Sequence, residues 1–412
     1  MTVNTRATEA TTTAEPLDIL ALYRTMVTAR VTNDLLKTRK TQGKFPFYIG
    51  CAGHESMAAV AATLNPDDWM SLYYRDLGAW LQRTGDIYGP LREAYSRTTG
   101  PMGAGRNMPS HYSNRRKRIL PTFSEVGALA PFAGGVSFAL KREKRSEIIM
   151  FTTGDGGAAT NDFNALFRQA AVHQLPILMV VEDNGWAITA ASPIQWAGSL
   201  VEWARGGGVY AEEVDGTDTM ATYQASTRLV EHIRSGKGPV LMHLRLGLLD
   251  PHSSSTDIKA YRTKEEIEAT TATKDPVKNF GRWLIENGYL QQGEHVLNVP
   301  TWQENTPRGA KRQLPMLGAI NEALVELAKR DDGFFVYGQD VGSPKGGVFG
   351  ATANLVTQFP GRAISSPLNE QVIVGIAAGA GMVDGRARCA EIQFVDYHQS
   401  AAQTIRMAAR TS

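Results

Sequence analysis

The sequence has little of what marks extracellular, membrane-spanning or nucleic-acid-binding proteins. Only two of its 412 residues are cysteines, Cys51 and Cys389, too few for a disulfide framework or a zinc site built on cysteine. It lacks an uninterrupted apolar run of about 18 residues, so no membrane span is expected. Its 43 basic and 41 acidic residues nearly cancel, so net charge favours neither nucleic acid nor an anionic membrane. We therefore expect a cytoplasmic globular protein with neither as a partner.

Two interruptions divide the chain. Residues 1–16 contain glutamates and no apolar core of a secretory signal, and are predicted to form a mobile tail. Residues 298–315 combine prolines with a basic cluster and are predicted to form a linker. In 17–297 and in 316–412, helical stretches alternate with short apolar runs. This alternation predicts an α/β protein of two modules, each with a parallel sheet flanked by helices.

The second module opens with a helical pattern and ends abruptly. Leucine and isoleucine recur at helical spacing, and "FFVYG" then reads as a strand; the helical set is Leu317, Ile320, Leu324 and Leu327. The last residues, "AAQTIRMAARTS", predict a helix without a capping residue. We therefore expect this module to be incomplete.

A strand, helix and strand follow one another around the segment "EIIMFTTGDGGAAT". Strands are predicted at 148–152 and 176–183, with a helix at 162–173 between them. In such a crossover the carboxyl ends of both strands meet at one edge of the sheet, where ligands bind in open α/β folds. Asp155 and Asn184 are therefore expected to be neighbours.

A carboxylate and an amide oxygen are ligands that magnesium or calcium prefers. Gly156 and Gly157 would let the backbone approach a phosphate closely. Together they predict a metal-bridged diphosphate. The alternative is that the Gly-Asp-Gly segment is only a tight turn and Asn184 a turn residue.

Several segments resemble one family in the same order. "GDGGAATNDFNALFRQAAVHQLPILMVVEDNGWAIT" is similar to the magnesium and thiamine diphosphate motif of the decarboxylating first component of 2-oxo-acid dehydrogenase complexes, in its α-type subunit. "LYYRDLGAWL", "GAGRNMPSHY" and "PHSSSTDIKAYR" resemble further α-type segments. After the linker, "SPLNEQVIVGIAAGAG" and "AEIQFVDYHQSAAQTI" resemble the β-type subunit. The resemblance implies two thiamine-diphosphate-binding modules, α-type and β-type, fused in one chain.

The resemblance implies roles for residues of the α-type module. Asp155, Asn184 and the backbone carbonyl of Trp186 would bind magnesium, while Tyr74 and Arg75 would bind the diphosphate. Other cofactor contacts would come from Ser124, Val126, Gly156 and Gly157. From the residues alone, Arg75 could equally form a surface salt bridge and Val126 could belong to any core.

It also implies the residues that manage the reaction. Glu370 would protonate the pyrimidine ring, against which Leu368 would pack. His252 would assist decarboxylation or acyl transfer, a role that ordinary histidine titration near neutral pH would suit. Read singly, Glu370 could be an acid in the first turn of a helix and His252 a solvated loop residue.

Two residues and the chain end depart from the family pattern. Asp183 replaces an asparagine common in the family, and Gln339 replaces a glutamate. The sequence also ends before the histidine loop of β-type subunits. A non-catalytic cofactor-binding or interaction fragment therefore remains an alternative.

The implied activity is oxidative decarboxylation of a 2-oxo acid with transfer of the acyl group to a lipoyl group of a dihydrolipoyl acyltransferase. "FPFYIG" and "GRNMPSHY" resemble branched-chain members more than pyruvate members, so a branched-chain acid is preferred over pyruvate or acetoin. Phe47, Tyr48 and Tyr397 are the candidate substrate-pocket residues. Because the family's cofactor lies between α-type and β-type modules, a homo-oligomer is expected.

Overall fold

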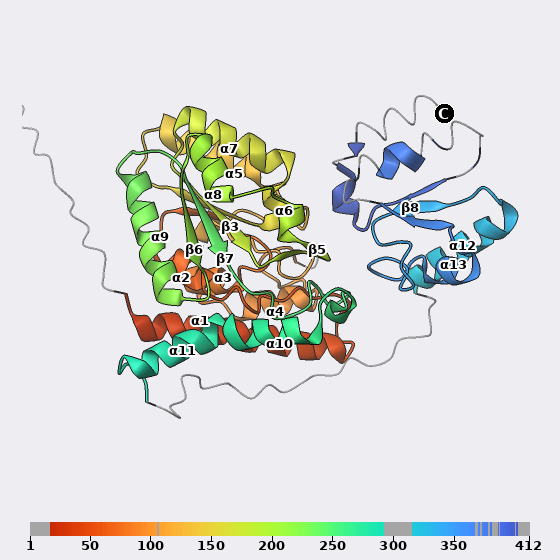
Figure 1. The fold of residues 1–412 in the computed structure, drawn as a ribbon, viewed down its shortest axis with the longest axis horizontal. Helices are drawn as coiled ribbons and strands as arrows, with labels where there is room; N and C mark the ends of the chain where they lie inside the picture. The colour runs from red at the N-terminus through yellow and green to blue at the C-terminus, as the bar shows by residue number, and fades with distance from the viewer. Residues whose placement is uncertain are drawn as a thin grey trace, which may run out of the picture. The chain divides into compact units, whose positions relative to one another are not determined.

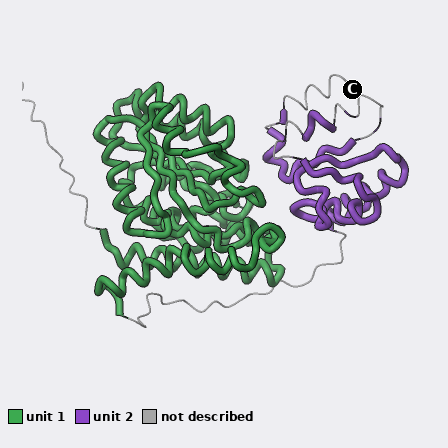
Figure 2. The backbone as a smooth tube through the Cα atoms, in the orientation of Figure 1, with its two compact units in different colours: residues 1–299 green, residues 300–412 purple. Residues whose placement is uncertain are grey.

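The protein consists of two compact units, residues 1–299 and 300–412 (Figure 2). The computed structural model describes residues 17–104, 107–291, 315–366, 370, 373–377, 380, 386, 388–399 and 401–402. The predicted tail 1–16, most of the predicted linker 298–315, and Leu368 lie outside the described residues.

In the first unit, the described residues form a parallel five-stranded sheet in the order β1-β2-β3-β7-β6. Its strands are β1 (Trp69–Ser71), β2 (Ile149–Gly154), β3 (Ile177–Asp183), β6 (Tyr210–Asp215) and β7 (Val240–Arg245). Every residue of β2 and β3 is buried, as expected for parallel strands covered on both faces. A short antiparallel hairpin follows β3, made of β4 (Trp186–Ala187) and β5 (Ala190–Ala191).

Helices cover both faces of this sheet (Figure 1). One apolar cluster joins the sheet to α2, α3 and α9, and a second joins its other face to α5, α7 and α8. Helix α1 packs against α2, α3 and α11. The helices of this unit are α1 (Ile19–Thr41), α2 (Met57–Ala62), α3 (Leu77–Thr84), α4 (Tyr88–Ala94), α5 (Ala130–Arg142), α6 (Asp155–Ala158), α7 (Asn161–His173), α8 (Leu200–Gly206), α9 (Thr219–Arg234), α10 (Lys264–Thr273) and α11 (Pro276–Glu286), with 3-10 turns η1 (Arg115–Lys117), η2 (Ser192–Ile194) and η3 (Ile258–Ala260).

The predicted crossover is confirmed as β2, α7 and β3. The hydroxyl of Thr160 accepts the N–H of Phe163 and starts α7, and Gln174 ends it in a left-handed conformation. Such residues satisfy the unpaired backbone groups at helix ends. The register pairs Gly154 with Glu182, so the residues that follow both strands lie at one edge of the sheet.

In the second unit, the described residues form a parallel three-stranded sheet in the order β10-β8-β9. The strands are β8 (Val336–Gly338), β9 (Ala363–Ser365) and β10 (Cys389–Glu391); the helical segments are α12 (Met316–Arg330), α13 (Ala353–Gln358) and the 3-10 turn η4 (Val395–Gln399). Leu324 and Ala328 of α12 pack on Phe334 and Val336. The predicted α/β class, with parallel sheets flanked by helices, is confirmed.

The predicted apolar face of α12 is only partly buried. Leu324 is buried, whereas Leu317, Ile320 and Leu327 are each about 40% exposed. The side that faces the small core carries Asn321, Leu324, Val325 and Ala328, because α12 is apolar on two sides and the sheet covers one.

Among the helices within the described ranges, none combines the length and apolar character that crossing a membrane requires.

Candidate cofactor site

Asp155 and Asn184 lie where β2 and β3 end. Asp155 opens α6 directly after β2, and Asn184 follows the last residue of β3. Ser192 connects the two segments, since its hydroxyl lies 2.5 Å from Asp155 Oδ2 and 2.7 Å from Asp183 Oδ1. The fold thus brings together carboxylates that are separated by a whole crossover in the sequence.

Asp155 is a buried carboxylate without a cationic partner. It is 3% exposed, and within the described part of the chain no basic side chain pairs with it. Burial is the main cause that raises its pKa, and the hydrogen bond from Ser192 offsets part of the rise. A metal ion here would supply the positive charge that Asp155 lacks.

Asp183, by contrast, has a cationic partner, Arg245. Its Oδ2 lies 2.6 Å from Nη1 of Arg245 and 3.0 Å from Nε2 of His243. Burial alone would raise the Asp183 pKa, but the hydrogen bond from His243, the nearby Ser192 hydroxyl, whose one hydrogen lies between Asp183 and Asp155, and the charge of Arg245 hold it below its usual range. The departure from the family's asparagine is therefore accommodated by the Arg245 ion pair and the hydrogen bond to His243.

Asn184 and Trp186 carry two further oxygens in the segment after β3, where β4 packs against α6. The N–H of Trp186 donates to Asn184 Oδ1 at 3.1 Å, and Gly185 between them has a positive φ of 91°, which glycine adopts without strain. Among the described residues, no group of three or more His, Cys, Asp or Glu side chains could hold a metal. The donors available with Asp155 are amide and carbonyl oxygens, the set that hard cations such as magnesium take.

Gly156 and Gly157 permit close packing of α6. A Cβ on Gly157 would lie 2.0 Å from Thr153 Oγ1 and 3.2 Å from Cβ of Val126, and one on Gly156 would lie 2.9 Å from Cβ of Ala187. Val126 therefore lies directly against the Gly-Asp-Gly turn. Close packing is therefore sufficient to explain glycine at both positions, and the predicted approach of a phosphate would be a second explanation.

Arg75 is buried, which excludes a surface salt bridge. It is 1% exposed; Nη1 donates to Gly50 O at 2.6 Å and Nη2 to His252 O at 2.9 Å. Its Nε has no hydrogen-bond partner among the described residues, and its guanidinium carbon lies 5.3 Å from the ring centre of Tyr74. A buried guanidinium held by neutral acceptors fits an anion such as a diphosphate.

Tyr74 interacts with Arg75 and also with Asp155, at the edge of the sheet where β2 ends. Its hydroxyl accepts a hydrogen bond from Tyr73 at 2.7 Å. Burial, above all, raises the pKa of Tyr74, and the negative charge of Asp155 acts in the same direction. Asp155, Tyr74 and Arg75 are thus within electrostatic reach of one another.

His252 lies beside Arg75 and is neutral. Its Nδ1 is 3.1 Å from Nη2 of Arg75; because arginine only donates, Nδ1 is the acceptor and Nε2 carries the hydrogen. Burial first, and the Arg75 charge second, lower the His252 pKa to about 3. The expected titration near neutral pH is therefore wrong for this conformation.

Ser124 pairs with a histidine that the sequence reasoning did not single out. The Ser124 hydroxyl is hydrogen-bonded to Nε2 of His111, and His111 Nδ1 lies 2.8 Å from the carbonyl of Pro109. Since a carbonyl only accepts, His111 carries its hydrogen on Nδ1 and Ser124 donates to the ring.

A buried acidic pair beneath the site was also missed. Asp76 Oδ2 accepts the hydroxyl of Thr152, whereas Asp76 Oδ1 and Glu182 Oε1 have no donor from any other described residue. Burial raises the pKa of Glu182 well above its usual value, as does the neighbouring Asp76, and burial raises that of Asp76 to about 6. The negative charge of Asp76 thus disfavours ionisation of Glu182 beyond the effect of burial. No periodicity or motif marks such a pair, because the two residues are joined only by the fold.

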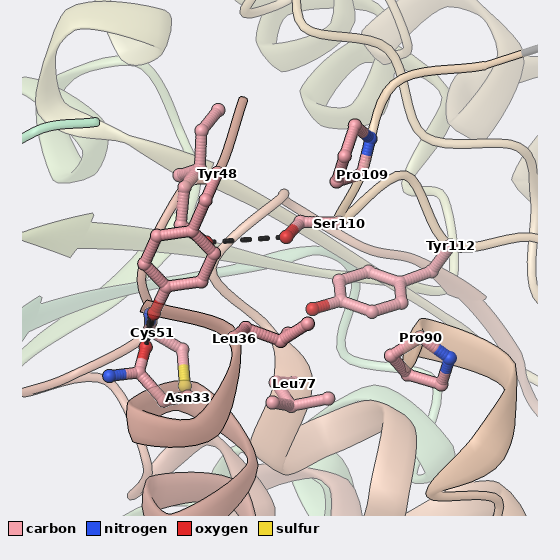
Figure 3. Close-up of a pocket in the computed structure, with 10 residues that line it drawn as sticks. Asn33, Leu36, Tyr48, Cys51, Leu77, Pro90, Pro109, Ser110 and Tyr112 are labelled. Carbon is pink, nitrogen blue, oxygen red and sulfur yellow. Dashed lines mark hydrogen bonds between the residues drawn. The ribbon is translucent and has the colours of Figure 1, made fainter. Parts of the chain in front are cut away.

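The candidate pocket residues Phe47 and Tyr48 are in the packed interior. Tyr48 lines a cavity of about 10 Å³, and its hydroxyl is hydrogen-bonded to Asn33 (Figure 3). This volume holds about one water molecule, so this cavity is too small for a 2-oxo acid. Phe47 is buried and is not among the described residues that line it.

In the second unit, Glu370 contacts Gln339. The Gln339 amide donates to Glu370 Oε1 at 3.3 Å, so the residue that replaces the family's glutamate hydrogen-bonds the proposed acid. Tyr397 lies in η4, its ring 5.2 Å from that of Phe394. Leu368 lies outside the described residues.

Comparison with protein families assigns a family profile to each unit. The sequence profile described as "Dehydrogenase E1 component" matches residues 23–298. The chain belongs to this E1 family. A second profile, "Transketolase, pyrimidine binding domain", matches residues 312–412. The predicted resemblance of the first module is thereby confirmed. Together, the E1 profile and the pyrimidine-binding profile imply thiamine diphosphate as the cofactor.

Several curated E1 α subunits are similar to this E1 chain. It is 33% identical over 273 residues to the 2-oxoisovalerate dehydrogenase subunit alpha of Bacillus subtilis (strain 168), covering 65% of this chain and 82% of that protein. It is 30% identical over 273 residues to the mitochondrial 2-oxoisovalerate dehydrogenase subunit alpha 1 of Arabidopsis thaliana, covering 66% and 58%. It is 32% identical over 284 residues to the pyruvate dehydrogenase E1 component subunit alpha of Acholeplasma laidlawii, covering 67% and 78%.

Proposed function

We propose that the protein catalyses the oxidative decarboxylation of a 2-oxo acid with magnesium and thiamine diphosphate. One observation carries this proposal: a buried carboxylate that lacks a cation, Asp155, and a buried guanidinium that lacks an anion, Arg75, lie at the same sheet edge around Tyr74. A metal-bound diphosphate would satisfy both. The E1 and pyrimidine-binding profiles support the choice of thiamine diphosphate.

Within this proposal, Asp155, the side-chain oxygen of Asn184 and the carbonyl of Trp186 hold magnesium, and Tyr74 and Arg75 hold the diphosphate. Ser124 and Val126 support the cofactor beside α6. When bound, thiamine diphosphate supplies a nucleophilic carbon and an electron sink for loss of the carboxylate.

The residues of the chain then orient groups and hold protons. His252 is neutral and carries its one ring hydrogen on Nε2. In the resting protein it therefore donates a hydrogen bond and does not act as an acid. Glu370 would hydrogen-bond the pyrimidine ring of the cofactor, and the Gln339 amide, which donates to Glu370 Oε1, would orient the Glu370 carboxylate. Leu368, which lies outside the described residues, would pack on the same ring. Fusion of α-type and β-type modules is supported by the order of the two profiles along one chain.

The proposed substrate is a branched-chain 2-oxo acid. Two of the similar proteins named above are 2-oxoisovalerate dehydrogenase subunits, which supports this choice. The pyruvate dehydrogenase subunit of Acholeplasma laidlawii has comparable identity, so pyruvate is the second candidate, with acetoin a third. The acyl acceptor is proposed to be the lipoyl group of an acyltransferase, and the working form a cytoplasmic homo-oligomer.

The activity is tested directly with 3-methyl-2-oxobutanoate and an artificial electron acceptor. We expect decarboxylation that needs magnesium and thiamine diphosphate and that Glu370→Gln abolishes. Cofactor binding without turnover in the wild-type chain would contradict the catalytic proposal and support the non-catalytic alternative.

A further inference from the structure

Asn184 is held by a fully buried histidine that the proposed chemistry does not use. His54 precedes α2, and its Nε2 lies 3.0 Å from Nδ2 of Asn184. Its Nδ1 lies 2.6 Å from Oε2 of Glu182. The three side chains are buried, and His54 is more than a hundred positions from both partners, so the fold alone brings them together.

The backbone N–H of Trp186 determines which atom donates and which accepts in each of these hydrogen bonds. The N–H of Trp186 can only donate, so the Asn184 atom 3.1 Å from it is the oxygen. The amide nitrogen of Asn184 therefore faces His54. Since that nitrogen only donates, His54 Nε2 accepts, and the ring hydrogen is on Nδ1, where it donates to Glu182.

We propose that His54 is a positioning residue that locks the Asn184 amide with its oxygen turned toward Trp186 and the metal site. This inference rests on the proposed function, because it takes Asn184 as a magnesium ligand. His54 does not touch the metal; it acts through the direction of one amide.

The lock matters because an amide has two unlike ends. Rotated by half a turn, Asn184 would present its NH₂ group, a donor that a cation cannot use, in place of a carbonyl oxygen. Glu182 holds the His54 ring from the opposite side. Loss of such an outer partner typically lowers metal affinity by about 10–100-fold.

The test measures the apparent magnesium Kd of the full chain at a fixed saturating thiamine diphosphate concentration. In His54→Leu, which fills similar space but cannot accept from Asn184, we expect a Kd raised by about tenfold or more. His54→Gln, whose amide can accept from Asn184 and donate to Glu182, should retain most of the affinity. His232→Leu, at the partly exposed His232 that stacks on Tyr210, is the matched control and should match wild type.

The outcomes separate this inference from the proposed function. If wild type shows no magnesium-dependent cofactor binding, the proposed function fails. If wild type binds but His54→Leu binds magnesium equally well, only the inference fails. Equal loss of metal-free thermal stability in both His54 variants, with unchanged magnesium Kd, would assign His54 a packing role and overturn the inference.

A second measurement needs no destabilising variant. In wild-type protein labelled with ¹⁵N-histidine, the ring of His54 should be neutral, with hydrogen on Nδ1 and none on Nε2; its signals are those missing from His54→Gln. A hydrogen on Nε2 would mean that the Asn184 amide points the other way and would refute the proposal.

Discussion

At the scale of single residues, burial and the charge of Arg75 together lower the His252 pKa. The guanidinium donates to Nδ1 of His252 and to its carbonyl. Both the fixed charge and the burial oppose protonation of the ring. An arginine proposed to bind phosphate thus adds to the effect of burial in disfavouring protonation of His252.

Removal of the Arg75 charge is therefore expected to raise the His252 pKa. In Arg75→Gln the value should rise above about 3 but stay below that of a free histidine, because burial is the larger cause. Histidine ¹⁵N shifts followed against pH measure it. An unchanged titration in Arg75→Gln would show that burial acts alone.

Glu391 makes the stability of the second unit depend on pH. Burial first, and the charge of Asp340 second, raise its pKa to about 7, above the unfolded value. The folded state therefore holds this proton more tightly, so the stabilisation is complete below about pH 4.5 and is lost as pH rises through 7. The shift corresponds to about 3 kcal/mol.

Hydrogen exchange of the β8 to β10 amides, corrected for intrinsic rates, should thus show weaker protection at pH 8 than at pH 5. Glu391→Gln should remove most of this difference. Equal pH dependence in wild type and variant would rule out Glu391 as the cause.

Sequence alone identified the ligand candidates but not the residues that hold them. Asp155 and Asn184 were predictable because each directly follows an apolar strand of one crossover. His54, Glu182 and Ser192 were not, because their partners are brought to them by tertiary structure and no spacing along the chain marks them.

At the scale of elements, α6 is packed so closely that it tolerates no side chain at Gly157. Gly157→Ala would place Cβ 2.0 Å from Thr153 Oγ1 and should cost about 1–3 kcal/mol, as overpacking does. Thr153→Ala should rescue it, since Thr153 Oγ1 is buried without a partner among the described residues. Thermal unfolding of the single and double variants measures the coupling.

Gly135 is the matched control for this prediction. It lies in α5, and nothing in the described structure comes within 4 Å of an added Cβ. Gly135→Ala should therefore stabilise by about 0.5–1 kcal/mol through helix propensity. Destabilisation by both alanines, without rescue by Thr153→Ala, would contradict the packing explanation.

Whether a segment forms a helix or a strand was predictable where its periodicity was strong. Which side of the helix is buried was not. The crossover from β2 to β3 matched its prediction within two residues at each end, because strand, helix and strand each have a clear pattern. The helix α12 was correctly predicted, yet only Leu324 of its predicted apolar set is buried. A helix apolar on two sides does not show in its own sequence which side the neighbouring sheet covers.

At the scale of the whole molecule, each unit carries its own set of the proposed functional residues. The first holds Asp155, Asn184, Tyr74, Arg75 and His252, and the second holds Glu370 and Gln339. Family profiles match these units in the same order. The α/β class followed from alternation of elements, whereas the working assembly depends on surfaces that no local pattern specifies.

The central claim is that Asp155 anchors a metal-bound diphosphate, and calorimetric titration of thiamine diphosphate tests it most directly. Wild type should bind in the presence of magnesium and lose binding when magnesium is chelated, and Asp155→Ala should not bind under either condition. Asp162→Ala, at an exposed carboxylate in the first turn of α7, should bind like wild type. Magnesium-dependent binding that persists unchanged in Asp155→Ala would contradict the account.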